Sequence, residues 1–183
     1  MLAIFGVVSA MATPMIGNLV TYLKVSGDAR NISNAIALVK IRAASNFTKT
    51  RLYVDLSGRQ HHLEIWVKTT PPGAWVMEGD NVKLSSGVIF GYGSVSNAPP
   101  NSQGTIGQAP QCTTAAGVAI GNTACVTFNS RGVPVDAADA PTAADAVYVT
   151  DGAAIHGVTV SATGMSRNWR SQTTAGTATW LQQ

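Results

Sequence analysis

The sequence predicts an α+β protein in which one long N-terminal α-helix packs against a C-terminal antiparallel β-sheet or β-sandwich head. Hydrophobic residues recur at every third or fourth position as far as Phe47, which is the period of one buried helix face. Beyond Thr50 the period changes to two, and turn residues separate the short hydrophobic runs. Only 11% of the residues are charged, whereas ordinary globular domains have about 25%. A chain rich in Thr, Ser, Gly and Val and poor in Glu and Lys is typical of an exported β-rich protein.

The chain has 183 residues, enough for one domain with a modest appendage. Hydrophobic residues make up 45% of it, which excludes a charge-rich disordered chain and a long exposed coiled coil. The formal net charge is +3, which is too small to indicate nucleic-acid binding by itself.

Residues 1–23 contain no charged side chain, and most of them are apolar or small. A secretory signal peptide would need a basic start and a small-residue cleavage site, and only a weak form of the site is present, at residues 10–12. A membrane-spanning helix would need about 20 apolar residues, and this run reaches Val20 only by including polar residues. A core helix at the N-terminus is the third interpretation.

The segment that follows favours a continuous helix over a cleaved signal peptide. Its apolar residues form one helical stripe, while charged residues take other positions around the helix; the stripe comprises Val25, Ala29, Ile32, Ile36, Val39, Ala43 and Phe47. We expect one helix from the apolar segment to about Phe47. It should be kinked or loosened at Pro14, because proline lacks an N–H donor and clashes with the preceding turn. The alternative at this position is a helix that ends at Thr13.

Short strands are predicted throughout the rest of the chain, separated by Gly, Pro, Asn, Asp and Ser. They are residues 51–56, 63–69, 75–77, 83–90, 124–128, 146–150 and 157–162. No helical stretch of comparable quality lies between them, so the sheet should be antiparallel. Two polar stretches, 94–116 and 136–145, are predicted loops.

An apolar N-terminal helix that contains Gly6 and Pro14 and runs on into a β-rich head resembles the helix of type IV pilins and pseudopilins. Within that superfamily, the chain resembles the minor pseudopilin GspH of type II secretion and its pilus relative FimT. The matching segments are IALVKIRAASNFTK (36–49), VKLSSGVIF (82–90), VTFNSRGVP (126–134) and VTVSATGMSRNWR (158–170). They span nearly the whole chain and occur in the family's order.

The resemblance implies a structural minor pseudopilin of a type II secretion system or type IV pilus. Residues 1–23 would be the apolar membrane and filament-core part of the helix, 24–50 its amphipathic part, and 51–183 a periplasmic head. The implied partners are other pseudopilins or minor pilins, the inner-membrane assembly platform and the bacterial inner membrane itself, which the chain would cross once. Aligning Gly6 and Pro14 with the family places Met1 inside the helix, so we expect either an internal start or a trimmed segment.

Cys112 and Cys125 are the two cysteines, and in the oxidising periplasm that the resemblance implies they should form a disulfide. Binding of a metal by the two thiols would need further ligands, and the sequence has no CxxC pair. A redox role is the other alternative.

No catalytic motif is present, so we expect no enzyme, no cofactor and no metal. The sequence contains no nucleophile elbow, no P-loop and no paired carboxylates on one element. His61 and His62 should point to opposite faces of a strand and be surface residues. Asp136, Asp139 and Asp145 could in principle bind calcium, but their spacing fits no known calcium loop.

One basic cluster suggests a second function class. Arg167, Trp169 and Arg170 follow Gly164 with no acidic residue nearby, and Arg beside an aromatic ring can hold phosphates and stack a base. FimT-like pilins are associated with DNA uptake through a basic C-terminal motif, although the arginines here are spaced differently. DNA binding through this cluster is therefore the alternative to the favoured structural role.

Overall fold

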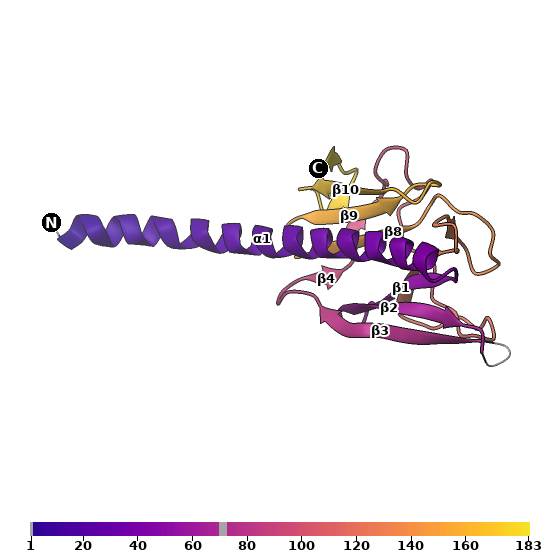
Figure 1. Ribbon diagram of the computed structural model, residues 1–183. Helices are drawn as coiled ribbons and strands as arrows, with labels where there is room; N and C mark the ends of the chain where they lie inside the picture. The colour runs from indigo at the N-terminus through magenta and orange to yellow at the C-terminus, as the bar shows by residue number, and fades with distance from the viewer. Residues whose placement is uncertain (1, 70–72) are drawn as a thin grey trace.

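The structure is a computed structural model that describes the backbone of residues 2–69 and 73–183, and the side chains of these residues from Val20 onward. One long helix precedes a β-rich head (Figure 1). The elements are α1 (Leu2–Ser45), β1 (Thr50–Asp55), β2 (Gln60–Val67), β3 (Ala74–Lys83), β4 (Ile89–Phe90), β5 (Ser94–Val95), β6 (Thr123–Phe128), β7 (Pro134–Val135), β8 (Ala146–Thr150), β9 (Ile155–Val160), β10 (Ser166–Ser171), β11 (Ala175–Gly176) and β12 (Leu181–Gln182).

Two five-stranded sheets form the head. The first sheet has the strand order β3-β2-β1-β6-β7, and the second sheet has the order β12-β10-β9-β8-β4. Neighbouring strands in both sheets are antiparallel, as the sequence predicts. The short β5 and β11 pair in parallel as a separate ribbon.

The predicted stripe on α1 is buried against both sheets. Each of its members from Val25 to Ala43 is at most 3% exposed, and all of them belong to the main core. That core also takes Leu52 from β1, Phe128 from β6, Val147 from β8 and Val158 from β9. Figure 1 shows the second half of α1 lying across the two sheets. The predicted α+β class is therefore confirmed.

The end of α1 differs from the prediction. The helix stops at Ser45, and Phe47 is 82% exposed rather than buried. Its φ of 49° lies in the left-handed region, and the next amide, that of Thr48, donates to the Ala43 carbonyl at 3.3 Å. This hydrogen bond closes the helix in the manner of a Schellman motif, which turns the chain and directs Phe47 away from the stripe.

A second core lies on the other side of the second sheet. Strands β8 and β9 are buried along their whole length, because α1 covers one face and the 94–109 segment and C-terminal residues cover the other. The members of this second core include Tyr148, Ile155, Trp169 and Trp180. The long predicted loop 94–116 thus acts as a cover for a sheet face.

The predicted strands 51–56, 63–69, 124–128, 146–150 and 157–162 correspond to β1, β2, β6, β8 and β9. The strand predicted over 75–77 is too short, since β3 runs from Ala74 to Lys83. A register shift opposite His61 and Leu63, with Gly79 at φ 80°, accommodates residues 78–81 as a bulge. The strand predicted over 83–90 is instead a turn followed by the two-residue β4.

The predicted disulfide between Cys112 and Cys125 is present. It joins the long loop to β6, and the Cys125 amide also donates to the Pro110 carbonyl at 2.8 Å. The bridge and this hydrogen bond hold the loop against the first sheet.

Replacing Ile36 by Ala should lower the free energy of unfolding by about 2–5 kcal/mol, because the side chain is 1% exposed in the main core. Ile41→Ala on the same helix is the matched control, since Ile41 is 63% exposed and should change stability little. Urea denaturation of the two variants measures the difference. Equal losses would contradict the assignment of the buried face.

Replacing both Cys112 and Cys125 by Ser should cost about 3 kcal/mol, because the unfolded chain loses a closed loop with a sequence separation of 13. Denaturation of the variant and of the oxidised parent measures this cost. Two titratable thiols in the denatured, unreduced parent would contradict the bridge.

Candidate functional site

The first candidate site is α1 itself, which divides into a part packed on the head and a part that extends away from it (Figure 1). The backbone is one α-helix from Leu2 to Ser45, so it continues past both Gly6 and Pro14, and the alternative end at Thr13 is excluded. The side chains of residues 1–19, including the predicted membrane segment and assembly residues, lie outside the described part. In the described part of the chain, no helix combines the length and apolar composition needed to cross a membrane.

The face of α1 opposite the buried stripe carries exposed apolar side chains. Within the described residues these are Val20, Leu23, Leu38 and Ile41, with exposed fractions of 44%, 58%, 44% and 63%. Scattered single apolar residues are normal on a protein surface, but these four share one helix face. This face is suited to packing against another apolar surface.

A second candidate site is the outer face of the first sheet, which carries a continuous stack of aromatic and cationic side chains. The stack comprises Lys49, Trp66, Trp75, Arg51, Tyr53 and His62. The Arg51 guanidinium lies 4.1 Å from the Trp75 ring centre and 5.6 Å from that of Tyr53. The rings of Tyr53 and His62 are stacked at 4.8 Å. Cross-strand pairing explains the ring contacts of the stack, because Trp66 is paired with Trp75 and Tyr53 with His62 in the strand register.

Arg51 is the buried cation at the centre of this stack. It donates to Glu64 at 2.5 Å and to the Thr113 carbonyl at 2.7 Å. Burial lowers the pKa of Arg51, and the neighbouring Glu64 opposes that shift. The arginine therefore ties the long loop, through Thr113, to β1 and β2.

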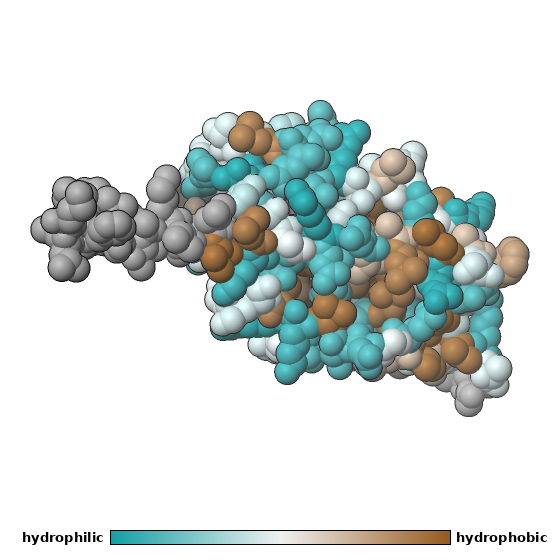
Figure 2. All heavy atoms as spheres, turned by 60° about the vertical axis from the view of Figure 1, so that its left-hand side comes forward, coloured by the Kyte–Doolittle hydropathy of each residue, from teal (hydrophilic) through white to brown (hydrophobic). Residues whose placement is uncertain are grey.

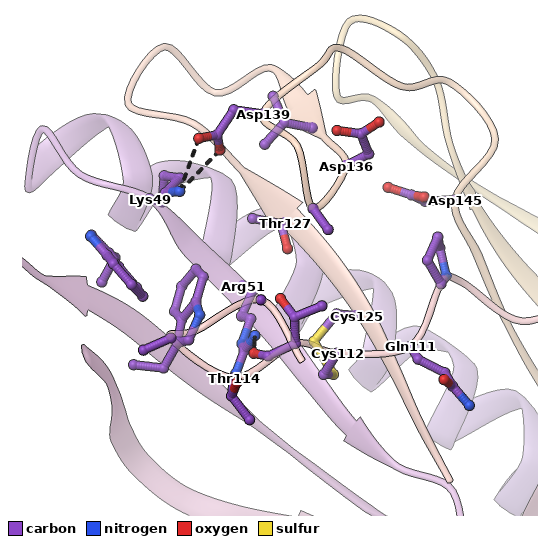
Figure 3. Close-up of a pocket in the computed structure, with 18 residues that line it drawn as sticks. Lys49, Arg51, Gln111, Cys112, Thr114, Cys125, Thr127, Asp136, Asp139 and Asp145 are labelled. Atoms are coloured by element: carbon purple, nitrogen blue, oxygen red, sulfur yellow. Dashed lines mark hydrogen bonds and ion pairs between the residues drawn. A yellow bond between two sulfur atoms is a disulfide. The ribbon is translucent and has the colours of Figure 1, made fainter. Parts of the chain in front are cut away.

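A small cavity of about 120 Å³ lies beside the stack, between the disulfide loop and the 136–145 loop (Figure 3). Figure 3 shows Lys49 pointing at Asp139, while Asp136 and Asp145 lie across the cavity from Arg51. Lys49 and Asp139 form an ion pair at 3.0 Å, and Asp136 accepts hydrogen bonds from the amides of Ala138 and Ala140. Two of the three carboxylates are thus already engaged.

Asp145 is the exception, because its buried Oδ2 has no hydrogen-bond partner among the described residues. The residue is 3% exposed. Burial, with a smaller contribution from Asp136, raises the pKa of Asp145 to about 7. The calcium alternative gains no support here, because no group of three His, Cys, Asp or Glu side chains in the described part could hold a metal ion.

The two adjacent histidines point to opposite faces, as predicted, but His61 is not a surface residue. It is 2% exposed and lines a groove of about 350 Å³ between α1 and the β2–β3 hairpin. Neither of its ring nitrogens has a partner among the described residues. Burial lowers the pKa of His61 to about 4, although Asp28 opposes the shift, so the ring is neutral at pH 7.

The structure does not bring the predicted basic cluster together on one surface. Trp169 is 6% exposed, and its Nε1 donates to Thr159 at 2.9 Å in the second core, so its ring is not accessible for stacking on a base. Arg167 and Arg170 are three residues apart in β10 and point to opposite faces of the strand. Arg167 is exposed, whereas the Arg170 guanidinium lies 4.5 Å from the Tyr22 ring of α1.

Sequence reasoning missed β10 and the aromatic stack. Strand β10 reads SRNWRS and lacks alternating hydrophobicity, so only its pairing with β9 and β12 reveals it. The stack did leave a signal, because its members in one strand, Arg51 and Tyr53 or His62 and Trp66, are separated by an even number of residues and so share one strand face.

Replacing Asp145 by Asn should stabilise the fold above pH 7. The pKa of Asp145 is about 7 in the folded chain and about 3.8 in the unfolded chain. Asp145 therefore lowers the free energy of unfolding as the pH rises between these two values. His61 and His156 act oppositely: their pKa values fall from 6.5 to about 4, so their stabilisation is lost as the pH falls through this range. Unfolding free energies measured from pH 4 to 8 should therefore rise more steeply in Asp145→Asn than in the parent.

Asp139→Asn is the matched control, because Asp139 is exposed on the same loop and its ion pair with Lys49 is at the surface. An equal gain from this control, or no gain from Asp145→Asn at pH 8, would contradict the buried charge.

No protein-family model and no curated protein matches the chain. Two solved structures are similar to it, both of the minor pseudopilin EpsH of the type II secretion system of Vibrio cholerae. The first has 13% sequence identity, covers 79% of this chain and 92% of its own, and has a TM-score of 0.45. The second has 10% identity, covers 87% of this chain and 96% of its own, and has a TM-score of 0.40.

Proposed function

We propose that this chain is a structural minor pseudopilin of a type II secretion system or type IV pilus. In this role the first part of α1 anchors the chain in the inner membrane and later packs in the core of a filament, while the β head lies in the periplasm. Other pseudopilins and the assembly platform are the partners. The role is mechanical and needs no cofactor.

The division of α1 carries this proposal. The second part of α1 has a buried stripe in the head, and the backbone of the first part extends well beyond the head (Figure 1). The extended segment, 1–19, contains no charged residue in the sequence. An apolar helix that its own domain does not cover needs lipid or other helices around it. Gly6 and Pro14 belong to this segment and remain the predicted assembly residues.

Two further observations support the proposal. The exposed Leu38 and Ile41 continue the free apolar face of α1 along the head, where a neighbouring helix could pack. The disulfide fits an oxidising compartment such as the periplasm. The competing DNA-binding role lacks a comparable observation, since its proposed residues do not share a surface.

Deleting residues 1–20 should leave a soluble, monomeric and folded head, because the stripe that holds the head together begins at Val25. The full chain should be found in the membrane fraction. Cell fractionation with circular dichroism of the purified deletion variant tests both statements. A deletion product that is insoluble or unfolded would place the apolar segment within the globular core.

Assembly can be tested separately in the full chain by replacing Ile41 with Glu. This change should prevent co-purification with other filament subunits while leaving the melting temperature of the head unchanged. Val118→Glu is the matched control, since Val118 is 62% exposed in a loop of the head. Normal assembly of Ile41→Glu would contradict a role for this helix face.

A further inference from the structure

The end of the head from which α1 extends, here called the stem end, gathers cations from several elements. Tyr22 of α1 lies at the stem end, and its ring centre is 4.5 Å from the Arg170 guanidinium near the end of β10. Further along α1, Asp28 accepts hydrogen bonds from the amide and hydroxyl of Ser85, a residue that follows the end of β3. The adjoining Leu84 amide donates to the Arg59 carbonyl at 2.9 Å. These contacts bring the ends of β3 and β10 and the β1–β2 turn to the same end of the head, as Figure 1 shows.

The cations of the stem end are Lys24, Arg30, Arg59, Lys83 and Arg170. The first four are exposed and Arg170 is half-buried. None of them forms an ion pair with any described residue. The arginines and lysines that do form ion pairs in the described part of the chain are Arg42, Lys49 and Arg51, which lie nearer the other end of α1. The stem end therefore presents five cationic side chains that form no ion pair with a described residue.

Three acidic residues near the stem end, Asp28, Asp55 and Asp151, accept hydrogen bonds. Asp28 accepts hydrogen bonds from Ser85, and Asp151 accepts hydrogen bonds from the amides of Ala153 and Ala154 at 2.8 Å. Asp55 accepts from the Gly58 amide, from Ser57 and from Gln60; the first of these bonds is the main cause that lowers its pKa. Each of these carboxylates thus accepts hydrogen bonds from neutral donors and forms no ion pair with the cations of the stem end.

Exposed apolar side chains lie among these cations. Leu23 of α1 is 58% exposed, and Leu181, which pairs with Arg170, is 61% exposed. Ile89 is 40% exposed and pairs with Thr150 beside the β8–β9 turn. Figure 2 shows hydrophobic atoms on the head beside the point where the grey N-terminal segment begins. Cations interspersed with exposed leucine and isoleucine are characteristic of a surface that meets phospholipid headgroups.

We propose that the stem end of the head binds the surface of a bilayer that contains anionic phospholipid. Lys24, Arg30 and Arg59 contact lipid phosphates, while Leu23 and Leu181 enter the headgroup layer. This inference rests on the membrane anchoring of the proposed function, because only an anchored α1 would hold this end against the bilayer. It adds that the head itself is docked on the lipid and is released when the charge attraction is weakened.

The test uses the full chain with a single fluorophore on Leu181→Cys, since the two native cysteines are bridged. The labelled protein is reconstituted into vesicles of phosphatidylcholine alone or of phosphatidylcholine and phosphatidylglycerol in equal parts, each with a nitroxide-headgroup lipid as quencher. Quenching should be stronger in the anionic vesicles and should fall in high salt. Lys24→Gln, Arg30→Gln and Arg59→Gln together should reduce it to the level of the neutral vesicles, because each removed cation weakens the contact about fivefold.

The matched control removes the same charge away from the stem end, with Lys68→Gln, Arg131→Gln and Arg167→Gln, and should quench like the parent. Vesicle flotation is measured in parallel. A chain that fails to float with either vesicle contradicts the membrane anchoring and this inference with it. If the chain floats with both kinds of vesicle but is quenched equally in both, the membrane anchoring stands and the lipid contact of the head is overturned. The lipid contact is also overturned if the control variant loses as much quenching as the stem-end variant.

Discussion

One helix face holds the whole head together. The buried stripe of α1 contacts hydrophobic residues of both sheets, so the same helix face covers the inner face of each sheet. Polar contacts fix the helix along its axis: Thr50 donates to the Val39 carbonyl at 2.7 Å, and Lys40 Nζ donates to the Thr163 and Gly164 carbonyls at 2.9 and 3.2 Å. Because packed interiors tolerate little displacement, the position of α1 sets the relation between the sheets.

The outward faces of the two sheets are completed in different ways. The second sheet is covered by its own long loop and C-terminal residues, which bury Tyr148 and Trp169 in a second apolar core. The first sheet instead carries Arg51 between aromatic rings, with Glu64 and a loop carbonyl as hydrogen-bond partners. A buried cation is tolerated only when it is paired and hydrogen-bonded in this way. The disulfide loop therefore belongs to the structure of this face.

The helix and the main strands could be predicted because their signals are local and periodic. The stripe from Val25 to Ala43 and strands such as β8 show the helical and strand periods directly. Phe47 fits the same period, but the helix ends at Ser45 and Phe47 itself has the left-handed conformation, which phenylalanine rarely adopts and its identity does not predict. Strand β10 is polar and exists through its neighbours, and burial of His61 depends on how α1 crosses the hairpin. Such features arise from long-range packing, which periodicity does not record.

The continuity of α1 has a mechanical consequence. A pull on its N-terminus acts along the helix axis, parallel to the line of side chains that it buries between the sheets. Under that geometry the stripe is loaded in shear, so Val25, Ile32, Ile36 and Val39 must slide out of their contacts together instead of separating one at a time. The hydrogen bond from Thr50 to the Val39 carbonyl and the one from Lys40 to the Thr163 carbonyl also join the helix to the head and share the same load. The head is thereby attached to its helix in the direction that resists extraction most strongly.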